Sequence, residues 1–591
     1  MKRTILALGA AAALGIAGTS HAVVYFGKGD ISHAVVDEYL AAHPNRQAGH
    51  GVPPFSVAEK GLKAAEPANA LTNYAGGVGH MLFSPYFSAQ GNNQTIFTIV
   101  NTDEDNGKAV KVRFRSAANS DDLLDFTLLL SPGDVWSASV TQNSSGMLTV
   151  NPTEDTTCTL PAKDPNGWTT LAERLPGGLA KDVKAVQTLE GYIEVLNMAD
   201  IPKDSDPYGL YQSIEHQETS DGTRVPGNCS SPAVRKLLDT VMPANSDKLL
   251  SDYGLSAPTG GLFGSWWILN QDKLAGFSGA MTAIRAEYVA PVAPDETPIP
   301  GVNAPGNVVF APQVGAKFEP IKIKLAAGEA VANIQDLTAD PLLTGEITAW
   351  KDDAKKDCEK VDGEGEVDDA CKPVYSKPAL KALWYDLPDM STPILEAPDE
   401  SGSLFAQTPT QQIESLQLRH SSIMNEYTAA PDYDVPMTTD WVVSQPTRRY
   451  YAAVDYNTNN VWLNGNAYQM ENGNPYDGLI VKKQDTGMPV ACISGIGLTT
   501  FDREEGGTVT MAELSGGSSQ VSCGEVFVMS FGGTMLNAKA TQSFVTPKGQ
   551  AGWGYIGSDA KLPLLGFAAT AALNEVTNVH YDTTYPHRWN D

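Results

Sequence analysis

Several signatures of nucleic-acid binding and disorder are missing from this chain of 591 residues. Cations are the scarcer charge, with 41 Lys and Arg against 69 Asp and Glu and a formal net charge of -28. A protein that holds DNA or RNA by neutralising phosphates needs a basic surface, so this balance excludes a nucleic-acid partner of that kind. Hydrophobic residues make up 42% of the chain, which supplies a core and excludes a wholly disordered protein.

Motifs that position a nucleophile, a metal or a phosphate are also missing. The sequence has no G-x-S-x-G, no H-E-x-x-H, no Walker loop and no G-x-G-x-x-G that follows a strand. Glycosidases need only two carboxylates and no fixed motif, but the adjacent Glu504 and Glu505 would face opposite sides of a strand, which is typical of solvated residues. We therefore assign no catalytic and no cofactor-binding residue, and we expect a protein that is not an enzyme.

Long apolar runs are absent after the N-terminus. Lys2 and Arg3 precede an apolar run over residues 5–18, and Ser20-His21-Ala22 provides the small residues that a signal peptidase recognises. This pattern predicts a signal peptide over residues 1–22 and an exported protein that is extracellular or at the cell surface, with the periplasm as the alternative. Later apolar runs have the length of strands, so we expect no transmembrane segment.

The six cysteines contain no C-x-x-C or C-x-x-C-H, which excludes the usual zinc and c-type haem sites. An even number of cysteines in an exported chain predicts three disulfides, for which 15 pairings are open. Pairing between sequence neighbours is the simplest. It joins Cys158 to Cys229, Cys358 to Cys371, and Cys492 to Cys523.

Strand patterns dominate what is present. Val110, Val112 and Phe114 alternate with three cations, which predicts a half-buried strand with Arg113 in solvent. Residues 94–100 form the expected partner strand, joined to it as a hairpin by the turn 101–107. Helical periodicity is confined to short pieces, around residues 36–42, 57–65, 179–188, 232–242 and 412–427. We therefore expect a mainly β fold, an antiparallel β-sandwich-like architecture with short helical crossovers.

The expected organisation after the signal peptide has four parts. They are a mixed leader over 23–76, a β-rich region over 77–290, a Pro-rich linker or crossover over 291–312, and a second β-rich region over 313–591. The two β-rich regions are either separate modules or parts of one architecture.

Oxygen-rich loops make calcium the one ligand that the composition favours. The candidate ligands are Asp103, Asp105, Asp362, Glu364, Glu366, Asp455, Asn457 and Asn459. All three loops depart from the EF-hand pattern, so a solvated turn is the favoured interpretation of each.

Two groups of aromatic residues are candidates for a surface on which sugars stack. They are Trp266-Trp267 and Trp553-Gly554-Tyr555. Aromatic residues beside glycine in β-proteins more often fill the core, so we expect both groups to pack inside the fold.

Blocks of sequence spread over most of the chain carry a resemblance to a known family. They cover residues 84–87, 94–101, 108–115, 124–126, 130–136, 190–195, 258–264, 424–427, 439–443, 446–450, 501–505 and 564–567. Together they resemble an uncharacterised family of exported proteobacterial proteins described as cell-surface or hypothetical proteins. The resemblance implies export and a β-rich body, and it transfers no catalytic residue.

These observations favour a secreted structural or interaction protein of the bacterial cell surface, such as a surface-layer or extracellular matrix component. Self-association or cell-surface glycans are the partners that this hypothesis implies. The alternative is a secreted carbohydrate-binding or carbohydrate-active protein.

Overall fold

The computed structural model shows a mainly β protein, as predicted. The residues that the structure describes are 70–152, 155–160, 162, 167–170, 175, 179–203, 209–238, 254–256, 259–288, 304–305, 308–310, 322–325, 328–331, 343–350, 373–382, 393–395, 418–431, 435–448, 452–455, 460–464, 476, 478–494, 496–504, 507–510, 521–547, 549–574 and 579–590. Within this part of the chain, no helix is long and apolar enough to span a bilayer.

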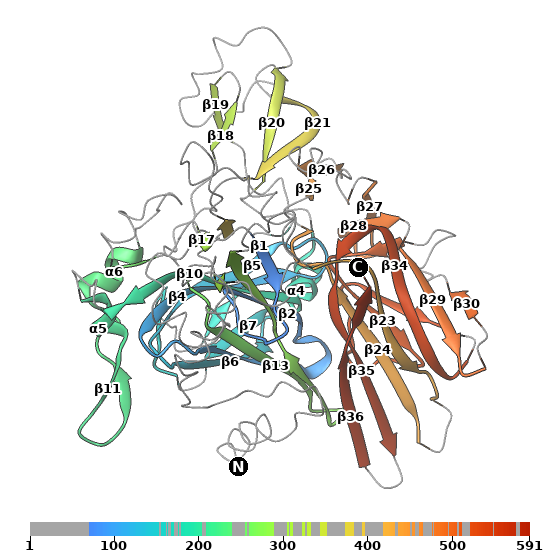
Figure 1. The fold of residues 1–591 in the computed structure, drawn as a ribbon. Coiled ribbons are helices and arrows are strands. Elements are labelled where there is room, and N and C mark those ends of the chain that lie inside the picture. The colour runs from blue at the N-terminus through green and yellow to red at the C-terminus, as the bar shows by residue number, and fades with distance from the viewer. Residues whose placement is uncertain are drawn as a thin grey trace, which may run out of the picture.

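Two sheets form what we call the N-terminal sandwich, which is the blue and green body in Figure 1. Sheet 1 has the order β1 (Ala70–Asn73), β15 (Thr282–Tyr288), β2 (Met81–Ser88), β10 (Glu190–Pro202), β4 (Asn106–Ser116), β5 (Asp122–Leu130) and β8 (Cys158–Leu160), with β16 (Ala304–Pro305) paired to β15. Sheet 2 has the order β14 (Ala275–Ala280), β13 (Leu262–Asn270), β3 (Asn93–Asn101), β6 (Val135–Gln142), β7 (Leu148–Pro152) and β9 (Trp168–Thr169).

Two further sheets form the C-terminal sandwich, which is the orange and red body in Figure 1. Sheet 3 has the order β30 (Gly507–Thr510), β29 (Gly497–Asp502), β34 (Ala551–Pro563), β23 (Arg419–Thr428) and β37 (Arg588–Asn590). Sheet 4 has the order β33 (Gln542–Val545), β32 (Val526–Phe531), β24 (Met437–Ser444), β35 (Leu565–Asn574) and β36 (Val579–Pro586).

Smaller elements surround the two sandwiches. The small sheets are β11 (His216–Glu218) with β12 (Arg224–Pro226); β27 (Ile480–Lys483), β28 (Pro489–Ser494) and β31 (Val521–Cys523); β20 (Leu343–Trp350), β21 (Pro373–Ala382), β26 (Asn460–Asn464) and β25 (Ala452–Asp455); β17 (Val308–Phe310) with β22 (Pro393–Leu395); and β18 (Lys322–Leu325) with β19 (Gly328–Val331). The helices among the described residues are α4 (Lys181–Thr188), α5 (Leu210–Ile214), α6 (Pro232–Leu238) and a short 3-10 turn over Gln90–Asn92.

Alternating apolar residues hold the N-terminal sandwich together. Phe97 of sheet 2 meets Phe114 of sheet 1 with ring centroids 5.7 Å apart, and Trp136 of sheet 2 meets Phe126 of sheet 1 at 5.5 Å. All four side chains are about 1% exposed or less. Edge-to-face and tilted aromatic pairs of this kind add to the free energy of burial, so these contacts fix the distance between the two sheets.

The two sandwiches lie side by side and share a core (Figure 1). Trp266 of β13 packs on Phe567 of β35 with ring centroids 4.5 Å apart. Along the same boundary, the side chain of Asp582 in β36 accepts the backbone N–H of Gly276 in β14 at 2.8 Å. The outer face of sheet 4 is therefore buried against the N-terminal sandwich, whereas sheet 3 lies on the far side of the C-terminal sandwich.

The predicted hairpin between residues 94–100 and 110–115 is wrong. Both strands exist, but β3 pairs with β6 and β13 in sheet 2, while β4 pairs with β5 and β10 in sheet 1. The turn between them contains Asp103, whose carboxylate accepts backbone N–H groups of Asp105 and Asn106. This turn leads the chain from one sheet to the other, because a polar turn alone does not specify whether the next strand pairs with the previous one or faces it.

The prediction of a half-buried strand is also wrong. Val110, Val112 and Phe114 do lie in the core, but Arg113 on the other face has no exposed surface. Glu194 of β10 lies directly opposite Arg113 and accepts its hydrogen bond at 2.9 Å. The alternation identifies the two faces of β4 correctly, and it does not reveal that the cationic face is covered and paired.

Helix predictions have mixed outcomes. The helical patterns at 179–188 and 232–242 correspond to α4 and α6, and Ser231 caps α6 by accepting the backbone N–H of Val234 at 3.2 Å. The helix predicted over 412–427 is wrong where the structure describes it, because residues 419–428 form β23 between β34 and β37. Pairing on both sides overrides the weak helical periodicity of this segment.

Two of the three neighbour pairings of cysteine are present as disulfides. Cys158 of β8 is bonded to Cys229, which lies just before α6. Cys492 of β28 is bonded to Cys523 of β31, and the two residues are direct partners in the sheet. Cys358 and Cys371 lie outside the described residues, as do the predicted signal peptide and most of the predicted leader.

Candidate binding groove on the C-terminal sandwich

The outer face of sheet 3 carries an aromatic surface that arises from a strict alternation in β34. Gly552 and Gly554 point inward, while Trp553 and Tyr555 point outward. A side chain at Gly552 would meet the carbonyl oxygen of Phe501 at 1.8 Å, so β34 needs glycine at this position to lie close to β29. The two strands approach one another closely, and the aromatic side chains are left on the outside of the sheet.

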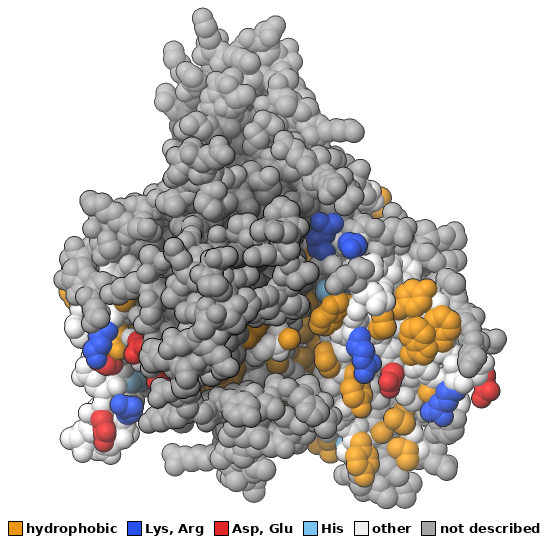
Figure 2. Space-filling model, in the orientation of Figure 1, with side chains coloured by type: hydrophobic (Ala, Val, Ile, Leu, Met, Phe, Trp, Pro, Cys, Tyr) orange, Lys and Arg blue, Asp and Glu red, His pale blue; other side chains and the backbone are white. Residues whose placement is uncertain are grey.

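Three rings on this outer face form a stack. Phe501 of β29 lies directly opposite Trp553 in the sheet, and their rings are stacked at 4.7 Å with an interplanar angle of 14°. Tyr555 adjoins Trp553 with ring centroids 6.3 Å apart. Trp553 keeps 43% of its surface exposed. Figure 2 shows hydrophobic side chains gathered on this side of the molecule, with charged side chains among them. We call Phe501, Trp553 and Tyr555 the aromatic platform.

A groove of about 500 Å³ runs beside the platform. Met424 and Glu426 of β23 line it, and both are residues of that strand that point away from the core. Trp553 of β34 stands on one side, and Arg588 of β37 stands on the other. Arg503, which follows β29, also lines the groove. Strands that are distant in the sequence thus bring an indole ring, a carboxylate and two guanidinium groups together.

The charged side chains of the groove differ in whether they form hydrogen bonds or ion pairs with other groups of the protein. The carboxylate of Asp502 accepts the backbone N–H of Glu504 at 3.0 Å, which makes it part of the turn after β29. Arg503, Arg588 and Glu426 are exposed and form no ion pair or side-chain hydrogen bond with any described residue. Within the described part of the chain, these three side chains are therefore available to a ligand.

The packing prediction for the aromatic residues is correct for Trp266 and wrong for Trp553, whereas Trp267 is only partly buried. Trp266 is 2% exposed and lies in the shared core, as expected. Trp553 is exposed and lines the groove. Gly552 and Gly554 place the small residues on one face of β34 and the aromatic residues on the other, but this alternation alone does not tell which face meets solvent.

Among the predicted calcium ligands, only Asp103 and Asp105 have side chains that the structure describes, and both belong to one loop. The carboxylate of Asp103 accepts hydrogen bonds within its own turn, and it lies 3.6 Å from Nζ of Lys108. Among the described residues, no group of three or more His, Cys, Asp or Glu side chains is placed to hold a metal ion. Asp362, Glu364, Glu366, Asn457 and Asn459 lie outside the described residues, and for Asp455 only the backbone is described. Calcium binding stays a prediction.

The junction between the sandwiches holds a second set of charged groups, which are buried. Glu194 accepts from Arg113, and the Tyr192 hydroxyl donates to Glu525 at 2.8 Å. Arg448 lies 3.4 Å from the Glu525 carboxylate and donates to the carbonyl oxygen of Gly524. Burial raises the pKa of Glu525, and the positive charge of Arg448 opposes that shift. The chain of contacts joins both sandwiches.

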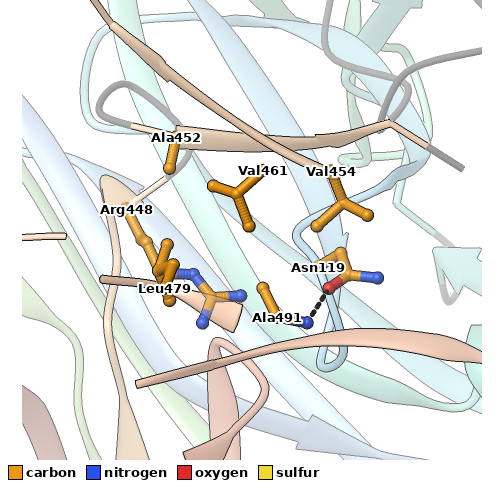
Figure 3. Close-up of a pocket in the computed structure, with 7 residues that line it drawn as sticks. All are labelled: Asn119, Arg448, Ala452, Val454, Val461, Leu479 and Ala491. Carbon is orange, nitrogen blue, oxygen red and sulfur yellow. Dashed lines mark hydrogen bonds between the residues drawn. The ribbon is translucent and has the colours of Figure 1, made fainter. Parts of the chain in front are cut away.

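A small cavity beside this network shows how tightly the junction is packed (Figure 3). Its volume is about 10 Å³, which is room for one water molecule at most. It is lined by Asn119, Arg448, Ala452, Val454, Val461, Leu479 and Ala491. Asn119 accepts the backbone N–H of Ala491 at 2.9 Å and donates to the carbonyl oxygen of Pro489. This cavity therefore has no space for a ligand larger than water, and the polar groups around it link the two sandwiches.

Two buried carboxylates fix one loop at the same junction. Asp440 of sheet 4 accepts the backbone N–H groups of Met535 and Leu536, each at 2.8 Å. Glu190 of sheet 1 accepts the backbone N–H of Ala540 at 2.8 Å. Burial raises the pKa of Glu190 to about 7, although the backbone donors favour the ionised form. Each sandwich therefore holds one end of the loop 534–540.

Comparison with protein-family models, with curated proteins and with solved structures finds no match to this chain. The groove must therefore be interpreted from its own geometry.

Proposed function

We propose that the protein is an exported interaction protein of the cell exterior that binds carbohydrate in the groove of sheet 3. The observation that carries this proposal is the exposed aromatic platform beside hydrogen-bonding side chains. A pyranose ring has an apolar C–H face that stacks on an aromatic ring, and a rim of hydroxyl groups that needs donors and acceptors. Trp553 supplies the stacking surface, while Glu426 and Arg588 supply an acceptor and a donor.

The volume of the groove and its position on a sheet face favour a chain of sugars over a single one. The space of about 500 Å³ lies on the face of a sheet, and residues from β23, β29, β34 and β37 border it. An exposed apolar surface of this kind is costly unless a partner covers it, which supports a role in binding. A polysaccharide or a cell-surface glycan fits this shape.

The proposed location outside the cytoplasm has two supports. The two disulfides are typical of an oxidising compartment. The sequence pattern of residues 1–22 predicts export. A surface-layer or matrix component would use such a groove to attach to glycans. The structural hypothesis and the carbohydrate-binding hypothesis are therefore compatible.

Affinity electrophoresis with a panel of neutral and acidic polysaccharides tests the proposal. We expect retardation of the wild-type protein by at least one polymer and loss of most of that retardation in Trp553→Ala. Tyr581→Ala is the matched control, because Tyr581 is an exposed aromatic residue of the same sandwich, at 69% exposure, that does not line the groove.

Two outcomes would contradict the proposal. One is the absence of binding to every polymer, and the other is equal retardation of Trp553→Ala and wild type. Release of reducing sugars from a bound polymer would show instead that the protein is a carbohydrate-active enzyme.

A further inference from the structure

We infer that the preferred ligand of the groove is an acidic polysaccharide, one whose sugars carry carboxylate groups as uronic acids do. This inference rests on the proposed function, because it concerns the same groove. The chemistry that points to it is the pair of guanidinium groups beside the aromatic platform.

The arginines of the groove differ from the buried cations of this chain. Acidic residues exceed basic ones by 69 to 41, so carboxylates are available to pair with the cations that the fold buries. The buried cations follow this expectation, as Arg113 pairs with Glu194 at 2.9 Å and Lys108 pairs with Asp200 at 2.9 Å. Arg503 and Arg588 line the groove without an ion pair to any described residue, although Asp502 and Glu426 line it too.

Guanidinium groups recognise carboxylates through two parallel hydrogen bonds, which makes arginine well suited to a planar acidic group. A uronic acid presents such a group at the edge of the same ring whose C–H face can stack on Trp553. The platform and an arginine can therefore contact one sugar at the same time. A neutral sugar would satisfy the platform and leave both guanidinium groups without a counter-charge.

The carboxylates in the groove limit how much negative charge the ligand can carry. Glu426 and Asp502 line the groove together with Arg503 and Arg588, so the groove presents two local positive groups and no general positive field. A polymer in which one acidic sugar alternates with a neutral one can place its carboxylate at an arginine and its hydroxyl groups at Glu426. A polymer with several anionic groups on each sugar would also bring charge against Glu426 and Asp502, which disfavours it.

Four polymers and three arginine variants test the inference by affinity electrophoresis and calorimetry of the full chain. The polymers are hyaluronan, hyaluronan with its carboxyl groups reduced to alcohols, dextran, and dextran sulfate. The variants are Arg503→Gln, Arg588→Gln and the control Arg224→Gln, which removes an exposed cation of β12 that does not line the groove.

We expect hyaluronan to bind about 10-fold more tightly than its reduced form, because a charge-assisted hydrogen bond is lost on reduction. Arg588→Gln or Arg503→Gln should remove most of this difference and leave the affinity for the reduced polymer within about 2-fold of wild type. Arg224→Gln should behave as wild type. Binding of hyaluronan should also weaken as NaCl rises from about 50 to about 300 mM.

The outcomes separate this inference from the proposed function. Equal affinity for hyaluronan and its reduced form overturns the inference and leaves carbohydrate binding intact. Stronger binding of dextran sulfate than of hyaluronan also overturns it, because the arginines would then form a general anion site. Binding of none of the four polymers, together with none of the wider panel, contradicts both.

Discussion

The groove of sheet 3 and the junction between the sandwiches use charged side chains in opposite ways. At the junction, Arg113, Glu194 and Glu525 are buried, and each is paired with a group of the protein. In the groove, Arg588 and Glu426 are exposed and have no partner among the described residues. The number of charges in a region thus says little about function, whereas the way in which the protein satisfies them separates a structural network from a binding surface.

The largest expected effect concerns the buried cation of the junction. Arg113→Asp places a second carboxylate beside Glu194 in a site without solvent, so it should destabilise the fold by at least about 3–5 kcal/mol. The exposed Arg588→Asp should change the free energy of unfolding by less than about 0.5 kcal/mol. Urea unfolding of both variants measures the difference, and similar midpoints would show that Arg113 is not buried as described.

Replacing a tryptophan with alanine should also cost much more stability at the junction than in the groove. Trp266→Ala removes a side chain from the core shared by the sandwiches and should cost about 3–5 kcal/mol. Trp553→Ala removes only a partly exposed stack on Phe501 and should cost less than about 1.5 kcal/mol. Thermal unfolding distinguishes them. A loss of stability in Trp553→Ala as large as in Trp266→Ala would place the platform in the core.

The pH dependence of stability separates two buried groups with opposite shifts. Burial raises the pKa of Glu190 to about 7, above its usual value of 4.5, so its contribution to stability is present below pH 4.5 and is lost as the pH rises toward 7. Burial lowers the pKa of His587 from 6.5 to about 4, so its contribution is present above pH 6.5 and is lost as the pH falls toward 4. The two effects oppose one another.

Single variants should reveal each effect as a change in the pH dependence of the free energy of unfolding. The change should be about 3 kcal/mol at most. Relative to wild type, Glu190→Gln should lose stability more steeply on acidification from pH 7 to 4.5, and His587→Gln should lose less. His587 receives a hydrogen bond from Asn425 at Nδ1 and contacts the carbonyl oxygen of Val442 through Nε2, which fits a neutral ring. Urea unfolding at several pH values checks both slopes, and variants with the wild-type slope would contradict these shifts.

The sequence predicted the mainly β class and the faces of individual strands, because alternation is a local property. It placed Val112 in the core and Arg113 on the opposite face, and the structure agrees with both positions. It did not predict that Glu194, about 80 residues away, lies opposite Arg113, since pairing between distant strands leaves no mark near either residue. The expected exposure of Arg113 was wrong for that reason.

The candidate site was predictable only in part. The Gly-Trp-Gly-Tyr pattern of 552–555 marks a strand with one crowded face, but the sequence does not say which face meets solvent. Arg503 and Arg588 came from segments that showed no motif, and they reach the groove because β29 and β37 belong to the same sheet as β34. Arrangements of this kind depend on sheet order, which local patterns do not specify.

Oxidative footprinting of tryptophan tests the central claim most directly. Trp553 and Trp589 are both exposed, at 43% and 51%, and only Trp553 lines the groove, so the second residue is an internal control. Hydroxyl radicals should modify both residues in the free protein. With an acidic polysaccharide bound, we predict strong protection of Trp553 and unchanged modification of Trp589. Unchanged modification of Trp553 under conditions where the polymer is bound would contradict the assignment of the groove as the binding site.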